Sequence, residues 1–173
     1  FGNGPEITVR ALADKSIYDR CKPLVVGDET SMCYAIKVAE KVHGIHLELN
    51  IVKSPSEGKY TYGFIDLMDL GMVPAESIPD TSDLDDSLDM DKPEPFGIGA
   101  SKIGGEASFQ YVKKVIELAM AGEVDATITN ALSKEAINMA GHHYSGHTEI
   151  YADYTGIKKY AMMLAHNDLR VIH

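Results

Sequence analysis

The sequence predicts an α/β protein, because short apolar runs of strand type alternate with segments whose apolar residues recur at helical spacing. Residues 23–27 form a short apolar strand of the buried type, and residues 29–43 repeat apolar side chains on one helical face before Gly44. Residues 64–68 are a second run of strand type, after a turn of Ser, Pro and Gly. A strand, a helix and further strands in this order are typical of α/β folds.

The chain opens with the turn sequence Phe-Gly-Asn-Gly-Pro-Glu. Its two glycines suit a tight turn, and Pro5 suits the first turn of a helix, which we predict over residues 7–12. A glycine loop that opens a helix usually follows a strand, so we expect the domain to begin before Phe1. The loop alone does not predict a phosphate site, because it lacks the Gly-x-Gly-x-x-Gly spacing and a Gly-Lys-Ser/Thr ending.

The next two segments of interest are an alternating stretch at residues 47–51 and an aspartate-rich stretch at residues 80–91. Leu47, Leu49 and Ile51 alternate with polar residues, which predicts a half-exposed strand. Residues 80–91 are rich in aspartate, but they lack the turn glycine and the closing glutamate of a calcium loop. We therefore interpret residues 80–91 as a solvated loop without chemistry.

A long helix is predicted over residues 106–121, after a stretch of prolines and glycines that reaches Gly105. Gly122 follows it as the residue that ends the helix. The apolar stripe of this helix is Ala107, Val112, Val115, Ile116 and Ala119. Such a stripe indicates a face that packs in the core.

Composition and charge limit the classes of function. The 173 residues, 45% of them hydrophobic, suit one globular domain with a substantial core. A net charge of -10 with scattered basic residues argues against nucleic acid or an anionic membrane as partner. No apolar run approaches the ~18 residues of a membrane span, and no signal peptide is visible. Cys21 and Cys33 form no disulfide or metal pattern, so we interpret them as core thiols of a cytoplasmic protein.

Most residues that could carry chemistry lie between positions 126 and 153. Residues 126–129 predict a strand, and a helix carrying Lys134 follows. A histidine-rich loop then leads into Gly-His-Thr-Glu, whose His147 and Thr148 precede the apolar spacing of another helix. Because a helix N-terminus favours anions, we predict a carboxylate or phosphate pocket with His147, Thr148 and Lys134 as the candidate binding residues.

Each of these residues has a simpler interpretation when taken alone. Thr148 could be only an N-cap, the glycines only turn residues, and the histidines only solvated side chains. Their convergence between a strand end and a helix start, where α/β folds place ligands, favours a binding site. A zinc hydrolase built on His142, His143 and His147 is one alternative, although they lack the His-Glu-x-x-His spacing. A module that binds a phosphorylated metabolite without turnover is another.

The end of the sequence predicts two more strands. Residues 160–165 form an apolar strand, residues 166–168 a turn, and residues 169–173 the start of a further strand. A domain seldom ends inside an apolar strand, because its unpaired backbone would need a partner. We therefore expect residues 1–173 to be the N-terminal part of a longer protein and to be prone to aggregation alone.

The central stretch resembles the 4-hydroxythreonine-4-phosphate dehydrogenase family, whose pattern there is close to T-x-P-[LIV]-[NH]-K-x-x-[IL] and then A-G-x-x-[FY]-x-G-H-T-E. The matching positions of this sequence are Thr129, Leu132, Lys134, Ile137, Ala140, Gly141, Tyr144, Gly146, His147, Thr148 and Glu149. The opening Gly-Asn-Gly-Pro-Glu is similar to the end of the family's first loop, and two late blocks, M-M-L-A and L-R-V, are also similar. The resemblance covers nearly the whole chain in the family's order.

The sequence also departs from the family pattern. Ala131 replaces the usual proline, Ser133 replaces asparagine or histidine, Asn3 replaces an apolar residue, and the family's opening Gly-Asp-Pro is absent. The family's metal-binding histidines lie beyond the L-R-V block, and His173 falls too early to be the first of them. We therefore interpret His173 as a strand residue and expect no metal ligand in this chain. Most of the family's cofactor-binding residues also lie in the missing half.

The resemblance implies a fold of the isocitrate/isopropylmalate dehydrogenase type, a three-layer α/β/α homodimer of which this chain is an incomplete part. It also implies oxidation of the C3 hydroxyl of a phosphorylated hydroxy acid by NAD, with a divalent metal (Zn, Mg or Co) and loss of CO2. His147 and Thr148 would contact the substrate. Lys134 is the third candidate, although a lysine after a strand is often only solvated.

The sequence around the Gly-His-Thr-Glu motif resembles more closely the catabolic branch of the family, which acts on phosphorylated threonate or erythronate. The pyridoxine branch acts instead on 4-phosphohydroxythreonine, and both branches need a phosphate anchor. Because the resemblance places the metal and most of the cofactor site elsewhere, we expect residues 1–173 alone to oxidise no substrate.

Overall fold

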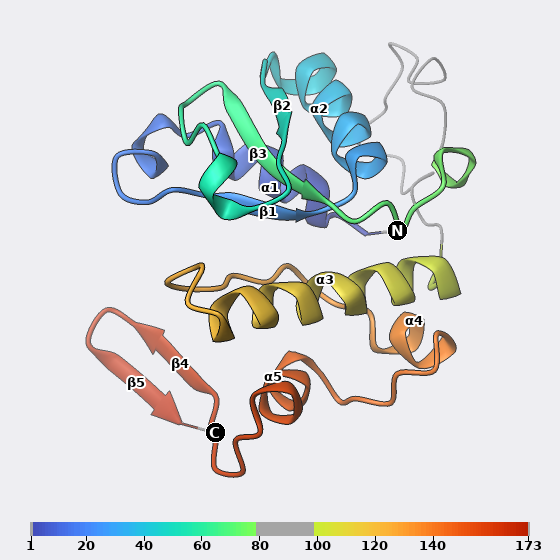
Figure 1. The fold of residues 1–173 in the computed structure, drawn as a ribbon, viewed down its shortest axis with the longest axis vertical. Coiled ribbons are helices and arrows are strands. Elements are labelled where there is room, and N and C mark those ends of the chain that lie inside the picture. The colour runs from blue at the N-terminus through green and yellow to red at the C-terminus, as the bar shows by residue number, and fades with distance from the viewer. Residues whose placement is uncertain (1, 79–98, 173) are drawn as a thin grey trace.

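The computed structural model describes residues 2–78 and 99–172 and confirms a mixed α/β fold with a parallel sheet (Figure 1). The interpretations of residues 80–91 and of His173 fall outside the described residues. Short 3-10 helices connect the main elements at Lys15–Ile17, Pro55–Glu57 and Ala75–Ser77. No helix in the described ranges is long and apolar enough to cross a membrane.

The sheet has three parallel strands in the order β1-β3-β2, formed by Leu24–Gly27, Phe64–Asp69 and Glu48–Ile51. Central strand β3 is the most buried, because β1 and β2 pair with its two edges. All three strands were predicted from the sequence. Strand β2 is half-exposed as expected, since each of its residues is exposed or partly buried.

Helices α1 (Gly4–Leu12) and α2 (Glu29–His43) pack together against the sheet. Gly44 ends α2 in the left-handed conformation, with φ of 64°, as its position in the sequence predicted. The core between these helices and the sheet consists of Val9, Leu12, Met32, Ala35, Ala39, Leu47, Ile65 and Leu67. Most of these residues are apolar positions of the two helical stripes and of β3, and Leu47 lies directly before β2.

Helix α3 (Lys102–Met120) runs alongside β1 (Figure 1) and starts earlier than predicted. The Ser101 hydroxyl caps it by accepting a hydrogen bond from the Gly104 amide at 3.1 Å, so Gly104 and Gly105 are helical. The prediction that these glycines precede the helix was wrong. Gly105 serves close packing instead, because a Cβ there would lie 1.9 Å from the carbonyl oxygen of Ala136.

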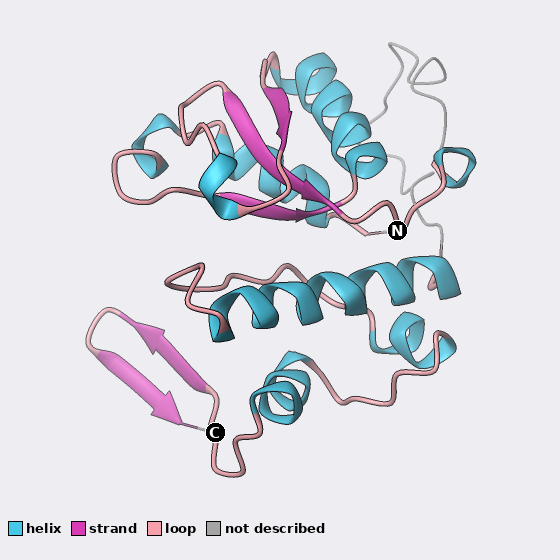
Figure 2. Ribbon diagram, viewed as in Figure 1, coloured by secondary structure: helices cyan, strands magenta, loops and turns pink. Residues whose placement is uncertain are grey.

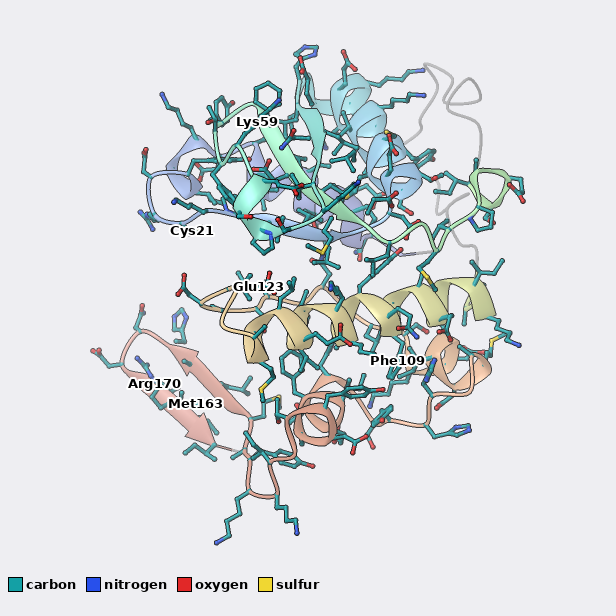
Figure 3. All side chains as sticks on the ribbon, in the orientation of Figure 1. Cys21, Lys59, Phe109, Glu123, Met163 and Arg170 are labelled. Atoms are coloured by element: carbon teal, nitrogen blue, oxygen red, sulfur yellow. The ribbon has the colours of Figure 1, made fainter. Side chains whose placement is uncertain are left out.

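A second core lies between α3, α4 (Lys134–Met139) and α5 (His147–Thr155). Phe109 points from α3 towards α5 (Figure 3) and joins Val112, Ile116, Ile137 and Ile150 in this core. The predicted stripe of α3 is buried at Ala107, Val112 and Ile116, whereas Ala119 is exposed. The helix that carries Lys134 and the helix that starts at the Gly-His-Thr-Glu motif are both confirmed.

The strand predicted at residues 126–129 is not present. These residues lie in a loop between α3 and α4 (Figure 2), and the Ile128 side chain is 94% exposed. Their β-branched side chains favour an extended chain, but a strand also needs a hydrogen-bonded partner. No neighbouring strand among the described residues supplies one.

The end of the described chain is a two-stranded antiparallel hairpin, β4 (Met163–His166) and β5 (Leu169–Ile172). Strand β4 begins later than predicted, and His166 pairs with Leu169 instead of lying in the turn. The turn is Asn167-Asp168, with Asn167 at φ 46°, a conformation that asparagine tolerates.

Both cysteines are free and exposed, so the interpretation as core thiols was wrong. Cys21 follows the first 3-10 helix, where the chain runs over the surface, and Cys33 lies on the outward side of α2. The helical stripe that packs on the sheet passes through Met32, Ala35 and Ala39, which leaves position 33 outside it.

Candidate functional site

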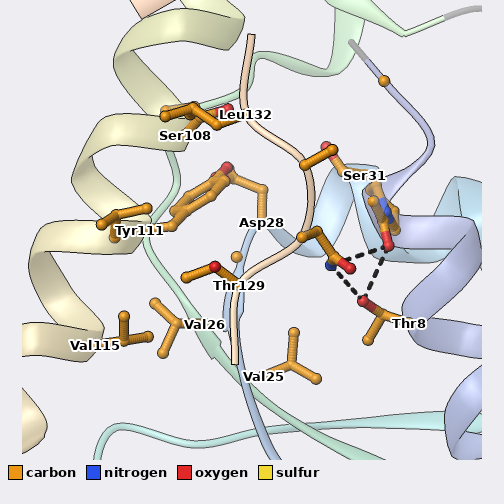
Figure 4. Close-up of a pocket in the computed structure, with 18 of the residues that line it drawn as sticks. Thr8, Val25, Val26, Asp28, Ser31, Ser108, Tyr111, Val115, Thr129 and Leu132 are labelled. Carbon is orange, nitrogen blue, oxygen red and sulfur yellow. Dashed lines mark hydrogen bonds between the residues drawn. The ribbon is translucent and has the colours of Figure 1, made fainter. Parts of the chain in front are cut away.

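A cavity of about 190 Å³ lies between the start of α1, the carboxyl end of β1, α3 and the loop at 128–132 (Figure 4). The carboxyl ends of parallel strands are where α/β folds place ligands. The polar and glycine residues of the wall that matter below are Gly4, Thr8, Asp28, Tyr111, Asn130 and His147. The cavity therefore collects side chains from segments that are far apart in the sequence.

His147 reaches the cavity from the first position of α5. Its side chain is partly buried, and this burial lowers the pKa of the imidazole below its ordinary value. Near neutral pH the imidazole is therefore uncharged when nothing is bound. An anion beside it would favour the protonated form and so raise the pKa again.

The N-terminus of α5 carries no side-chain cap, because the N-cap residue is Gly146. Thr148 is the second residue of the helix, so the alternative interpretation of Thr148 as the N-cap was wrong. The first main-chain hydrogen bond of the helix runs from the Ile150 amide to the Gly146 carbonyl at 3.4 Å. Amides of a first turn that lack a capping side chain remain available to an anionic ligand.

The other two predicted binding residues lie outside the cavity wall. Thr148 is partly buried in the first turn of α5. Lys134 is exposed at the first position of α4, whose N-terminus is capped by the Ser133 hydroxyl, which accepts from the Ala136 amide at 3.2 Å. The structure thus brings His147 to the cavity wall and leaves Lys134 and Thr148 outside it.

Asn130 is a cavity residue that the sequence did not single out. Its side-chain amide donates to the Gly4 carbonyl at 3.2 Å and to the Thr8 hydroxyl at 2.9 Å. The Thr8 hydroxyl in turn donates to the same carbonyl at 2.9 Å, which completes the triangle of dashed lines in Figure 4. This network fixes the loop at 128–132 against the start of α1.

Asp28 and Tyr111 form a second contact that sequence reasoning missed. Asp28 is 2% exposed, and its carboxylate accepts from the Val73 amide at 2.9 Å and from the Tyr111 hydroxyl. Burial, together with this hydrogen bond, raises the pKa of the Tyr111 phenol. The pair ties the end of β1 to α3, and no local pattern marks it, because the two residues are far apart in the chain.

The comparisons with known proteins bear on what this site does. The family described as "Pyridoxal phosphate biosynthetic protein PdxA" matches residues 19–173. The chain belongs to the PdxA family. This confirms the resemblance that the sequence motifs indicated.

Curated and structurally solved PdxA relatives are similar over nearly all of the chain. A D-threonate 4-phosphate dehydrogenase of Cupriavidus necator is 36% identical over 99% of this chain, and a 4-hydroxythreonine-4-phosphate dehydrogenase of Trichlorobacter lovleyi is 39% identical over 98% of it. A crystal structure of a 4-hydroxythreonine-4-phosphate dehydrogenase from Burkholderia phymatum superposes with a TM-score of 0.79 at 38% identity, over 99% of this chain. The chain covers 45% of each of the first two proteins and 46% of the third.

His142, His143 and His147 do not gather into a metal site in the described structure. His142 is bonded to Glu106, His143 is exposed, and His147 faces the cavity. Within residues 2–78 and 99–172, no group of three His, Cys, Asp or Glu side chains is placed to hold a metal ion. The described residues therefore do not fit the zinc hydrolase alternative.

Proposed function

We propose that this chain is the substrate-binding part of a dehydrogenase that acts on a small phosphorylated hydroxy acid. The observation that carries the proposal is the PdxA family match over residues 19–173, with relatives named as dehydrogenases of 4-phosphorylated threonate and hydroxythreonine. The site supports it, because His147 and the uncapped start of α5 offer hydrogen-bond donors to an anionic group.

The size of the cavity favours a small acid over a dinucleotide. Its volume of about 190 Å³ is below the roughly 300–1,000 Å³ of clefts that hold larger ligands. A cavity of this size suits a small phosphorylated acid better than a complete dinucleotide. In the proposal, the cofactor and metal ligands belong to parts of the enzyme outside this chain.

Within this proposal the chain binds and orients the substrate. Anchoring the phosphate or carboxylate at His147, Thr148 and the first turn of α5 would hold the C3 hydroxyl in one place for reaction. Lys134, exposed at the first position of α4, would be a weaker third contact that adds positive charge. The reaction itself is the oxidation of that hydroxyl by NAD in the presence of a divalent metal (Zn, Mg or Co), after which the β-keto acid loses CO2.

The same proposal includes the architecture and setting of the whole enzyme. It would be a homodimer with the three-layer α/β/α arrangement of isocitrate and isopropylmalate dehydrogenases. Its free cysteines suit a reducing compartment such as the cytoplasm. The preferred substrates are 4-phosphothreonate and 4-phosphoerythronate, with 4-phosphohydroxythreonine as the alternative of the pyridoxine branch.

The test uses the full-length enzyme and the three candidate substrates. NADH formation is followed with each substrate in the presence of Zn, Mg or Co, and binding is followed by calorimetry on the same samples. Turnover of one or more substrates is expected. Binding without NADH formation would instead establish a phosphorylated-metabolite module. The absence of both binding and turnover would refute the proposal.

A further inference from the structure

We infer that His142 is a positioning residue for His147, acting through its bond to Glu106 on α3. This inference rests on the proposed function, because it concerns how the proposed anion-binding histidine is held in place. His142 occupies a variable position of the Gly-His-Thr-Glu pattern, so the family motif does not assign it a role. The role is inferred instead from the contacts that His142 makes in this structure.

The His142 ring is fixed by two directional contacts with α3. It stacks on the Phe109 ring, with 3.6 Å between the ring centroids and 11° between the planes. Its Nε2 atom lies 2.7 Å from Oε2 of Glu106. Stacking fixes the plane of the ring and the hydrogen bond fixes its rotation within that plane, so little freedom remains.

Glu106 is a firm acceptor for this bond. Its other carboxylate oxygen accepts from the Gln110 side-chain amide at 2.7 Å. The hydrogen bonds from Gln110 and His142 lower the pKa of Glu106, so it stays ionised at neutral pH. An ionised carboxylate cannot donate, and Nε2 of His142 must therefore carry the proton.

The main chain at His142 is held as well. Its amide donates to the Ile137 carbonyl at 2.9 Å, which ends α4, and Gly141 provides the required turn at φ 96°. The loop to His147 thus leaves α4 from a fixed point and in a fixed direction.

The far end of the same loop rests on the same aromatic ring. Tyr144 stacks on Phe109 at 5.8 Å and 21°, and its hydroxyl donates to Asp153 of α5 at 2.6 Å. Ile150, three residues after His147, is completely buried beside Phe109. His147 therefore lies between two anchored positions, and its direction into the cavity depends on how the loop sits on α3.

The chain supplies a matched control at the next position. His143 is exposed and makes no hydrogen bond within the described part of the chain. The two adjacent histidines thus differ in the contacts that the inference requires. Identical substitutions at 142 and 143 separate positioning from a general effect of losing a histidine.

The first experiment measures kinetics of the full-length enzyme. His142→Phe keeps a ring to stack on Phe109 but loses the bond to Glu106, and we expect KM for the phosphorylated substrate to rise by roughly 5- to 50-fold with kcat within about 3-fold. His143→Phe should leave both constants unchanged. His142→Gln, which can still donate to Glu106, should recover most of the affinity. A normal KM in His142→Phe would overturn the inference, as would equal effects at 142 and 143.

The second experiment does not depend on turnover. Inorganic phosphate is titrated into the full-length protein while the His147 imidazole resonances are followed by NMR. Phosphate should bind roughly 5- to 50-fold more weakly to His142→Phe than to the wild type or to His143→Phe. Equal affinities, or no phosphate-dependent shift at His147 in the wild type, would overturn the inference. A lack of NADH formation with every substrate would refute the proposed function alone.

Discussion

Gly105 and Ala136 bring the backbones of α3 and α4 into direct contact. A Cβ at position 105 would lie 1.9 Å from the carbonyl oxygen and 2.3 Å from the carbonyl carbon of Ala136. Alanine is a better helix former than glycine by about 1 kcal/mol, but these neighbours are backbone atoms that cannot rotate away. We expect Gly105→Ala to lower the free energy of unfolding by about 1–3 kcal/mol because α4 must shift.

Urea unfolding of the full-length protein measures this effect, and Gly99→Ala is the matched control. Gly99 is exposed, and nothing lies within 4 Å of a Cβ built there. An unchanged unfolding midpoint in Gly105→Ala would mean that separating the two helices costs no more than the roughly 1 kcal/mol gained in helix propensity. That result would contradict the tight packing described above.

Tyr111→Phe tests the buried link between β1 and α3. The substitution removes the hydroxyl that donates to Asp28 and leaves one carboxylate oxygen without its partner. A buried acceptor left unpaired costs about 1–3 kcal/mol, and Tm should fall accordingly. Tyr160→Phe, at a side chain that is 53% exposed, should leave Tm unchanged. Equal Tm values for the two variants would show that water replaces the lost donor.

His147→Ala tests the candidate anion site directly. In the full-length enzyme we expect kcat/KM to fall by roughly 10- to 1,000-fold, the loss of about one charge-assisted hydrogen bond, with little change in stability. The control His43→Ala removes an exposed histidine at the end of α2. Kinetics that match the wild type would exclude a substrate-binding role for His147.

Thr148→Val separates binding from helix capping. Because Gly146 is the N-cap of α5, the loss of the Thr148 hydroxyl should not destabilise the helix start. We expect weaker substrate binding with Tm unchanged, measured by kinetics and calorimetry on the same preparation. A fall in Tm with normal kinetics would instead assign Thr148 a structural role.

The lowered pKa of His147 predicts a pH-dependent stability. The unfolded chain takes up a proton at this residue near pH 6.5, whereas the folded protein does so only at lower pH. Between these two pKa values the unfolded state binds more protons than the folded state. The free energy of unfolding must therefore fall as the pH drops from 6.5 to the lowered pKa, and it should stay level below that. In His147→Asn this part of the pH dependence should be absent. Unfolding free energies of the two proteins in phosphate-free buffers, compared across that window, provide the measurement, and parallel curves would contradict the prediction.

Local patterns were enough to predict most of the fold. The signals for α2 and β1 depend only on neighbouring residues: the apolar spacing of α2 with the glycine at 44, and the short apolar run of β1. The predicted strand at 126–129 failed because a strand also needs a partner that local sequence does not specify. The start of α3 was misplaced for a related reason, since Gly105 is explained by its contact with Ala136 and not by a turn.

The candidate site was only partly predictable from sequence. The Gly-His-Thr-Glu motif identified His147, because a histidine before a helical apolar spacing is a local signal. Asn130 forms hydrogen bonds with residues near the start of the chain, and Asp28 accepts a hydrogen bond from Tyr111, which lies 83 positions later. Contacts between such distant positions follow from the tertiary fold, so no spacing rule could reveal them.

The strand order β1-β3-β2 places the last-made strand of the sheet in the middle. Among the described residues β1 and β2 do not pair with each other, so the hydrogen bonds of this three-stranded sheet can form only once β3 is present. At a synthesis rate of about 5–20 residues per second, β1 and β2 would wait for β3 for on the order of a second or more. The first helices can form during that delay, whereas the sheet can only assemble afterwards, in a single step around β3.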